Sequence, residues 1–297
     1  MPHLVVKKED GSLLFDTNNI TYGLVKSGYM TYQQAWTRRT LRSAQLDPSD
    51  GANWFPSNIQ TSLSFADGLW GFTVTNAISP IVFIVGSGTL NGSSVSGSSI
   101  TFFYSNADTN TKYYCFDLVS DNITGSPYLK TFNSAGRITF NSLQPPLNIA
   151  GSYQAPVPGS LDQYGRYGTC YAGGSNRVRQ AFYNSGGITY VGKVDSYIDI
   201  PLTAGVEYAV YLPWSRGGGI GDFMSGGTGT FLVYSVLEGA YGRVGGISFM
   251  MGASAATTQS TPNNQGWSLY ASFFNIPTDR YPVALYITTT NLPFPFG

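Results

Sequence analysis

The sequence is poor in the residues on which most catalytic and metal sites depend. Its 297 residues include one histidine, His3, and two cysteines, Cys115 and Cys170, which lie far apart. A Ser-His-Asp or Cys-His arrangement would have to use His3, and two separated cysteines do not make an ordinary zinc site. We therefore expect no catalytic residues, no metal and no cofactor. His3 is interpreted as a packing or surface residue, and both cysteines as buried thiols that form no disulfide.

Charged residues are also scarce. They form 11% of the chain, against about 25% in an average soluble domain, and 16 acidic residues balance 16 basic ones. A nucleic-acid-binding protein normally carries a basic excess on one face. The nearest approach to one is the cluster of Arg38, Arg39 and Arg42, which we interpret as a solvated edge or a protein contact. The sequence therefore predicts no nucleic-acid partner.

Long hydrophobic runs are missing. No apolar run approaches the roughly 18 residues that a membrane-spanning helix needs, and the longest surrounds residues 81–85. The first ten residues contain Lys7, Lys8, Glu9 and Asp10, and no apolar segment of the signal-peptide kind follows them. We expect synthesis in a cytoplasm, without a signal peptide and without insertion into a membrane.

The sequence is rich in residues that favour short strands and tight turns. It contains 36 glycines, 21 tyrosines and 18 phenylalanines. Many short strands without alternating helices are typical of all-β sandwiches or barrels. Residues Thr31 to Leu46 can be read as a helix or as a strand, and the segment from Leu143 to Gly165 is predicted to be a surface loop. Strands are expected at residues 71–74, 81–85, 100–104, 188–191, 197–200, 207–212, 230–235 and 268–273.

Two stretches of the sequence are nearly the same. PHLVVKKEDGSLLFDT starts at the second residue, and PYLKTFNSAGRITFNS starts at Pro127. Aligned without a gap, they pair Gly11 with Gly136 and Phe15 with Phe140. Because glycine accepts positive φ in tight turns, each stretch is predicted to form a hairpin with its turn at the shared glycine.

A second, weaker match lies at the other end of the repeated unit. KYYCFDLVSDNITG from Lys112 can be set against RYPVALYITTTNLP from Arg280, with Tyr113 over Tyr281. This places a boundary near Ser126 and leaves about 45 extra residues in the second unit. The sequence therefore predicts two tandem β-sandwich-like domains, residues 1–126 and 127–297, produced by an internal duplication and with the second enlarged by loop insertions.

Two segments resemble binding loops but are better explained as turns. RGGGIGDFMSGGTG from Arg216 has the glycine content of a phosphate-binding loop, but a strand rather than a helix is expected after it, so it is interpreted as a glycine-rich hairpin tip. Asp47 and Asp50 in LDPSDGANW could supply oxygen ligands to calcium. Asp-Pro and Asp-Gly are common turn formers, and we favour the turn.

Carboxylates of the second unit leave one enzymatic alternative open. Two carboxylates that face each other across a cleft would make a glycan depolymerase. The acidic residues share no spacing, and we expect them at strand ends: Asp162, Asp195, Asp199, Glu207, Asp222 and Glu238.

Aromatic residues on glycine-bounded loops are the candidate binding residues. Tyr164, Tyr167 and Tyr171 lie in QYGRYGTCYAGG, and Trp214 directly precedes the glycine run. Such rings can stack on sugars or anchor in a protein groove, because they offer a large contact area at a small entropic cost. The alternative is that they fill the ends of a sandwich. Binding by these rings would make the chain a lectin-like carbohydrate-binding module.

The hairpin motif resembles the opening of small tail-tip and minor tail (baseplate) proteins of long-tailed bacteriophages. In those proteins a strand is followed by D/N-x-G, an apolar residue, Phe, Asp/Asn and Ser/Thr. The resemblance covers about 30 residues over both copies. Here the motif is carried by Asp10, Gly11, Leu13, Leu14, Phe15, Asp16 and Thr17, and again by Asn133, Gly136, Ile138, Phe140, Asn141 and Ser142.

This resemblance implies a structural, non-enzymatic virion protein that is made in the host cytoplasm and located in the tail. Its implied partners are other tail or baseplate proteins, further copies of itself, with a trimer favoured, and a bacterial surface receptor. On this hypothesis residues 1–126 dock on the tail and residues 127–297 face outward.

Overall fold

The computed structural model describes residues 5–7, 9–11, 13–16, 19–36, 39–41, 50–56, 67–121, 123–183, 189–224, 230–254, 259–262 and 272–297. These residues form 23 β-strands and one 3-10 turn, Gly51–Asn53, and they contain no α-helix. The prediction of an all-β chain is confirmed. No helix that could cross a membrane is found in the described part of the chain.

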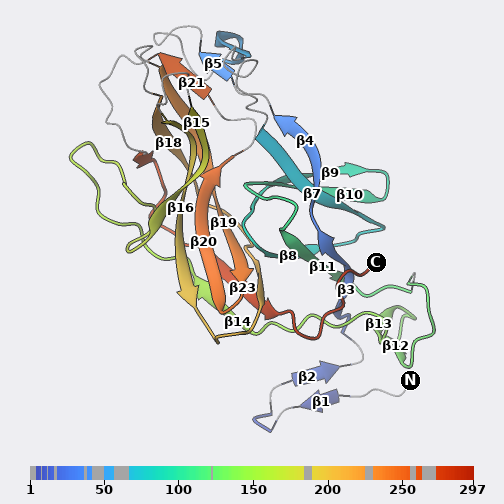
Figure 1. Cartoon of the computed structure of the whole chain (residues 1–297). Helices are drawn as coiled ribbons and strands as arrows, with labels where there is room; N and C mark the ends of the chain where they lie inside the picture. The colour runs from blue at the N-terminus through green and yellow to red at the C-terminus, as the bar shows by residue number, and fades with distance from the viewer. Residues whose placement is uncertain are drawn as a thin grey trace.

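One sheet of fifteen strands dominates the molecule (Figure 1). Its main path runs in the order β14 (Gly151–Gln154), β23 (Val283–Thr288), β17 (Tyr208–Tyr211), β8 (Ile81–Val85), β19 (Thr230–Arg243), β20 (Gly246–Ala253), β16 (Thr189–Pro201) and β15 (Ser175–Tyr183). A branch at β8 continues through β11 (Lys112–Leu118) to β3 (Tyr22–Tyr29). The remaining members are β18 (Gly217–Met224), β22 (Ser272–Phe274), β21 (Gln259–Pro262), β5 (Arg39–Leu41) and β6 (Trp54–Pro56).

A second sheet packs against the β3, β11 and β8 branch. It has the order β4 (Thr31–Trp36), β7 (Asp67–Thr75), β10 (Ser99–Ser105) and β9 (Thr89–Ser96). Phe72 and Phe102 from this sheet and Ile84 and Tyr113 from the large sheet meet in one buried cluster. The rings of Phe72 and Tyr113 stack with their centroids 3.6 Å apart. The two sheets therefore form a sandwich, as alternating apolar residues on facing strands require.

The large sheet crosses the predicted boundary near Ser126. Ile84 of β8 faces Val210 of β17, and Val85 faces Gly242 of β19. The buried cluster around Ile84 also includes Met250 from the second half. The two halves therefore share a sheet and a core, and they do not form two separate sandwiches. The division into residues 1–126 and 127–297 stays a prediction about how the chain arose.

The two predicted hairpins are confirmed and have the same register. β1 (Val5–Lys7) pairs with β2 (Leu13–Asp16), and β12 (Lys130–Phe132) pairs with β13 (Ile138–Asn141). Val5 faces Asp16 and Lys130 faces Asn141, so each pair lies 125 positions from its counterpart. The register shifts at the same place in both hairpins, and each turn holds a glycine with positive φ, 81° and 75°.

Strand order repeats as well. In the first half, β11 lies between β3, the first strand after the hairpin, and β8. In the second half, β23 lies between β14, the first strand after the hairpin, and β17. In the middle strand of each set, a tyrosine pairs with a glycine on one side and with an aliphatic residue on the other: Gly28–Tyr113–Ile84 and Gly151–Tyr286–Val210. Tyr281, which the sequence alignment set against Tyr113, precedes β23, and Tyr286, five residues later, holds the position in β23 that corresponds to Tyr113 in β11. Duplication of the whole unit stays a prediction.

Several local expectations are decided by the strands. Residues 31–36 and 39–41 are strands, which settles the choice for that part of Thr31 to Leu46. The expected surface loop from Leu143 was wrong in part, because it contains β14. Residues 197–200 lie in the same long strand as residues 189–191. His3, Asp47 and residues 268–271 lie outside the described residues, as do the side chains of Arg38, Arg39 and Arg42.

Candidate functional site

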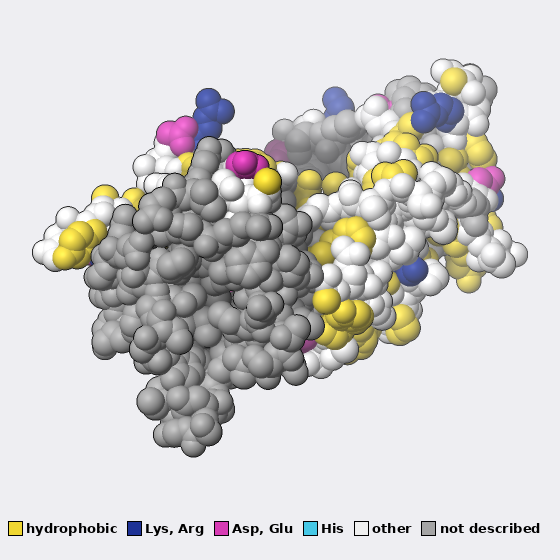
Figure 2. All heavy atoms as spheres, turned by 90° about the horizontal axis from the view of Figure 1, so that it is seen from above, with side chains coloured by type: hydrophobic (Ala, Val, Ile, Leu, Met, Phe, Trp, Pro, Cys, Tyr) yellow, Lys and Arg dark blue, Asp and Glu magenta, His cyan; other side chains and the backbone are white. Residues whose placement is uncertain are grey.

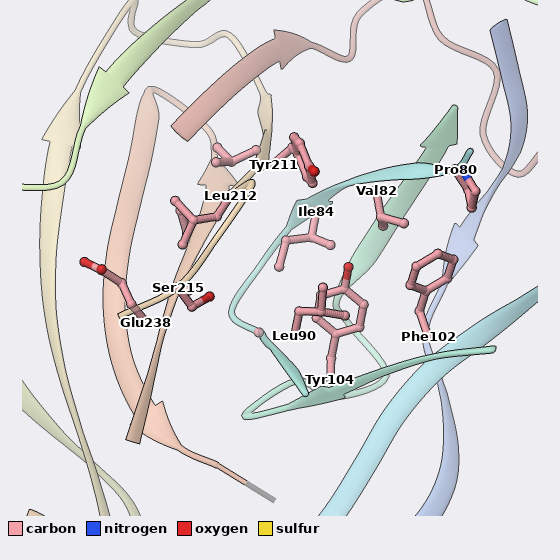
Figure 3. A pocket seen from close by; sticks show the side chains of 14 residues that line it. Pro80, Val82, Ile84, Leu90, Phe102, Tyr104, Tyr211, Leu212, Ser215 and Glu238 are labelled. Atoms are coloured by element: carbon pink, nitrogen blue, oxygen red, sulfur yellow. The ribbon is translucent and has the colours of Figure 1, made fainter. Parts of the chain in front are cut away.

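A cavity of about 120 Å³ lies where the two halves of the chain meet. β8, β9 and β10 supply one wall, and β17, β19 and the segment between β17 and β18 supply the other. Figure 3 shows side chains from both walls pointing toward a common space. Because these strands come from distant parts of the sequence, the cavity exists only in the folded chain.

The lining of the cavity is mainly apolar. Val82, Ile84 and Phe102 are buried within it, whereas Pro80 is partly exposed and Leu90 is exposed at its edge. Leu212 and Ser215 are also partly exposed. The cavity is therefore closed on the side of the sandwich core and open toward the surface beside β17.

Two hydroxyl groups point into this apolar space. Tyr104 rises from β10 with its hydroxyl toward Ile84 and Val82, and the Ser215 hydroxyl points in from the opposite wall (Figure 3). Tyr104 is 4% exposed, and the described residues give neither hydroxyl a hydrogen-bond partner. Burial, with the nearby Cys115 and Tyr211, raises the pKa of Tyr104, so its hydroxyl stays protonated.

A buried ion pair lies behind the cavity. The Arg216 Nε and Nη2 atoms donate to Glu238 Oε2 and Oε1, both at 2.7 Å, and neither side chain is accessible to solvent. The Tyr171 hydroxyl donates to Glu238 Oε1 at 3.0 Å, and the Arg216 guanidinium lies 4.7 Å from the centre of the Tyr281 ring. Such bidentate pairs are strong and directional. In Figure 3 the Glu238 carboxylate points away from the cavity.

Electrostatics keep Arg216 charged and Tyr171 neutral. Burial disfavours the charge on Arg216, but the hydrogen bonds and the charge of Glu238 outweigh it and raise the pKa of Arg216. Burial and the Glu238 charge raise the pKa of Tyr171 well above its usual value. The pair is therefore a fixed structural element, and Glu238 does not present a free carboxylate to a substrate.

Three consecutive residues before β18 take three different environments. Trp214 is 44% exposed at the surface, Ser215 lines the cavity, and Arg216 is buried behind it. The backbone N–H of Glu238 donates to the Arg216 carbonyl at 2.8 Å, which holds this segment against β19. Trp214, a predicted binding residue, therefore sits directly beside a residue of the cavity edge.

Tyr164, the second predicted residue on the surface, lies at the tip of a well-ordered turn and is 69% exposed. The Asp162 carboxylate accepts the backbone N–H groups of Tyr164 and Arg166 at 2.8 and 2.9 Å. The Arg166 guanidinium lies 4.6 Å from the centre of the Tyr164 ring. Asn133 accepts from Ala135 and Arg137 in the same way, so DQYGR and NSAGR form the same turn.

The other two predicted binding residues belong to the protein interior. Tyr167 is partly buried, exchanges backbone hydrogen bonds with Phe273 at 2.7 and 2.8 Å, and packs on the core of the second half. Tyr171 is fully buried, which corrects its expected role as a loop ring. The structure therefore does not bring the four rings into one binding surface; Trp214 and Tyr164 are the two that offer a ring to solvent.

The expectation that the carboxylates decorate strand ends was wrong for two of them. Asp195 and Glu238 lie within β16 and β19, and both are fully buried. Besides Glu238, four of the six carboxylates have a cation or a hydroxyl within reach, and the side chain of Asp222 lies outside the described residues. The contacts are Asp162–Arg166 at 2.9 Å, Asp195–Arg177 at 3.4 Å, Glu207–Lys112 at 2.8 Å and Asp199–Ser248 at 2.5 Å.

The remaining sequence expectations about chemistry can be checked in part. Cys115 and Cys170 are free, buried thiols, as predicted. Asp50 accepts the Ala52 N–H at 2.9 Å, as expected for a turn residue. Residues 217–224 form the strand β18, which pairs antiparallel with β19, so a hairpin is right, but these residues belong to its strand and not to its tip. No group of three metal-ligating side chains occurs among the described residues.

The cavity and the buried ion pair were missed by sequence reasoning. A cavity built from β8, β10 and β17 leaves no local motif. The sequence did contain a signal for the ion pair, because a single glutamate at position 238 interrupts an apolar strand. Buried charges are rarely unpaired, so a cationic partner for Glu238 could have been predicted.

Comparison of the chain with protein-family models, with curated proteins and with solved structures finds no match. Inferences about its function must therefore come from its own residues and geometry.

Proposed function

We propose that the chain is a non-enzymatic structural component of a bacteriophage tail tip or baseplate. The observation that supports this most is the pair of hairpins β1–β2 and β12–β13, which share one register and project from the same end of the body (Figure 1). The hairpin sequence motif carries the resemblance to tail proteins, and its geometry is the same in both copies.

Both hairpins have the properties of docking elements. Among the described strands, each strand of a hairpin pairs only with its partner. The second hairpin is tied to the body at β13, because the Thr139 carbonyl accepts the Thr21 N–H at 3.0 Å and the Asn141 side chain donates to the Ser120 carbonyl at 3.1 Å. Val5 and Val6 are exposed on the first hairpin, and Tyr128, Leu129 and Phe132 are exposed on the second. Exposed apolar side chains that gather on one element mark interaction sites. We infer that neighbouring tail proteins, or further copies of this chain in a trimer, cover them.

Low charge is consistent with a role as a building block. In the part of the molecule that Figure 2 draws in colour, only a few charged side chains lie among the hydrophobic ones. On this proposal the hairpin end docks on the tail, and Trp214 and Tyr164, which each expose a ring, are free to contact a bacterial surface receptor.

The proposal is tested on particles. We expect mass spectrometry of purified virions of a phage that encodes this chain to detect it at a fixed copy number, and immunogold labelling to place it at the tail end. Light scattering of the isolated chain should give the mass of an oligomer. Absence of the chain from purified virions would contradict the proposal.

A matched pair of variants tests the docking hairpin. Leu129→Ser with Phe132→Ser removes exposed apolar groups from β12 and its approach, and we expect fewer copies per particle. Ile149→Ser with Val157→Ser changes equally exposed apolar residues outside the hairpin and should leave incorporation unchanged. Equal incorporation of both variants would show that the hairpin is not a docking element.

A carbohydrate-binding module is the second candidate, because Trp214 and Tyr164 each offer a ring to solvent. Binding on a glycan array that is lost in Trp214→Ala or Tyr164→Ala would favour it. An array without signal would remove this candidate.

A further inference from the structure

The cavity between β8, β10 and β17 has the size of one small ring. A cavity of about 150 Å³ lined by Leu, Ile and Phe binds benzene, and this one measures about 120 Å³. Val82, Ile84 and Phe102 supply comparable apolar walls. A disaccharide, a nucleotide or a peptide segment is larger than this space.

The polar groups of the cavity further restrict its ligand. Tyr104 and Ser215 each direct a hydroxyl into it from opposite walls (Figure 3), and the described residues satisfy neither. A hydrogen bond contributes about 0.5–1.5 kcal/mol net, so a molecule that bonds to one of these hydroxyls gains affinity. Glu238 also lines the space, but its carboxylate is held by Arg216 on the far side. No free charge therefore faces the ligand.

We propose that this cavity binds a neutral molecule of the size of one aromatic ring that carries a single hydroxyl group, such as a phenol. The ring contacts Val82, Ile84 and Phe102, and the ligand hydroxyl exchanges a hydrogen bond with Tyr104. Ser215, at the open edge, offers the second polar contact. A charged ring is excluded because the apolar walls provide no counter-ion, and a sugar is excluded because two hydroxyls cannot satisfy its many polar groups. The inference does not depend on the role in a phage tail.

Saturation-transfer NMR on the full chain tests the site with four probes: phenol, toluene, benzoate and glucose. Phenol and toluene should receive saturation at millimolar concentration, and phenol should raise the thermal unfolding midpoint. Benzoate and glucose should give no signal. Absence of phenol binding, or binding of benzoate or glucose as strong as that of phenol, would overturn the proposal.

Two variants locate the bound probe. Tyr104→Phe removes one hydroxyl and keeps the ring, so phenol should bind about three- to tenfold more weakly while toluene binds as before. Ser215→Leu places apolar atoms in the cavity and should abolish binding of both probes. Ser152→Leu, at an exposed position that does not line the cavity, is the control and should bind both normally. Unchanged phenol affinity in Tyr104→Phe, or full binding in Ser215→Leu, would show that the ligand lies elsewhere.

Discussion

Arg216 and Glu238 carry charges at a place that water does not reach. Removing an ion from water is costly, and only the close bidentate contact with its partner offsets that cost. Tyr171 adds a third hydrogen bond to the same carboxylate. The cluster fixes the segment before β18 against β19, and through Ser215 it fixes one wall of the cavity.

Loss of one member of this pair should be far more harmful than loss of both. We expect Glu238→Ala to lower the free energy of unfolding by about 3–5 kcal/mol, because it leaves the Arg216 charge buried and unpaired. The double variant Arg216→Met with Glu238→Leu should lie within about 2 kcal/mol of the unaltered chain, since apolar groups of similar volume replace both charges. Denaturant unfolding measures both. A single variant as stable as the double one would contradict this account.

Ionisation of Tyr113 at alkaline pH should lower the free energy of unfolding. Burial, followed by the nearby Cys115, raises the pKa of Tyr113 to about 12 from 10.0. Because of the raised pKa, Tyr113 stays protonated to a higher pH in the folded chain than in the unfolded chain. Its contribution to the free energy of unfolding is therefore complete below pH about 10 and is lost as the pH rises toward 12. We expect the free energy of unfolding to fall over this window, with about 2 kcal/mol due to Tyr113. Tyr113→Phe should show a smaller fall; an identical fall would contradict the assignment.

At the scale of elements, three strands meet at Gly242. This residue of β19 faces Val85 of β8, and its carbonyl accepts the Gly86 N–H at 2.9 Å. A Cβ atom at Gly242 would lie 1.7 Å from the carbonyl oxygen of Tyr208 in β17. Only a residue without a side chain allows the backbones of β19 and β17 to approach this closely.

Gly242→Ala should therefore destabilise the place where β8, β17 and β19 meet. We expect a loss of roughly 3 kcal/mol or more, because backbone must shift to admit the methyl group. Gly217→Ala in β18 is the matched control, since its Cβ would meet only ordinary contacts at 3.7 Å, and it should change stability by less than about 1 kcal/mol. Thermal unfolding monitored by circular dichroism compares the two. Equal midpoints would contradict the role assigned to Gly242.

The elements that could be predicted from the sequence are those with local signals. The hairpin turns followed from Gly11 and Gly136, and the strand at residues 81–85 followed from an unbroken apolar run. β14 was missed because its four residues lie among Pro, Gly and Ser, and it becomes a strand only by pairing with β23. The cavity could not be predicted, because its walls are brought together by pairings between strands far apart in the sequence.

At the scale of the whole molecule, the shared sheet determines how the chain unfolds. β8 lies in the first half but pairs with β17 and β19 of the second. The cores are shared as well, because Ala209 and Ile287 pack with Leu24 and Phe83. Two halves that complete each other's sheet and core are expected to fold as one cooperative unit.

Separately expressed pieces test this expectation. We expect residues 1–126 alone, and residues 127–297 alone, to lack a cooperative unfolding transition, while the whole chain shows one. The reason is that each piece exposes an unpaired strand edge and part of a core. Differential scanning calorimetry measures the transitions. Two independent transitions in the whole chain, matched by those of the pieces, would show that the halves are autonomous domains.

The segment that holds Phe294 and Phe296 extends along β3. Ser27 and Phe296 exchange backbone hydrogen bonds at 2.8 and 3.1 Å, and both phenylalanine rings pack on the core around Leu24. The earliest long strand of the sequence is thus completed by some of its latest residues. During translation the region around β3 therefore cannot be completed until residue 296 has left the ribosome.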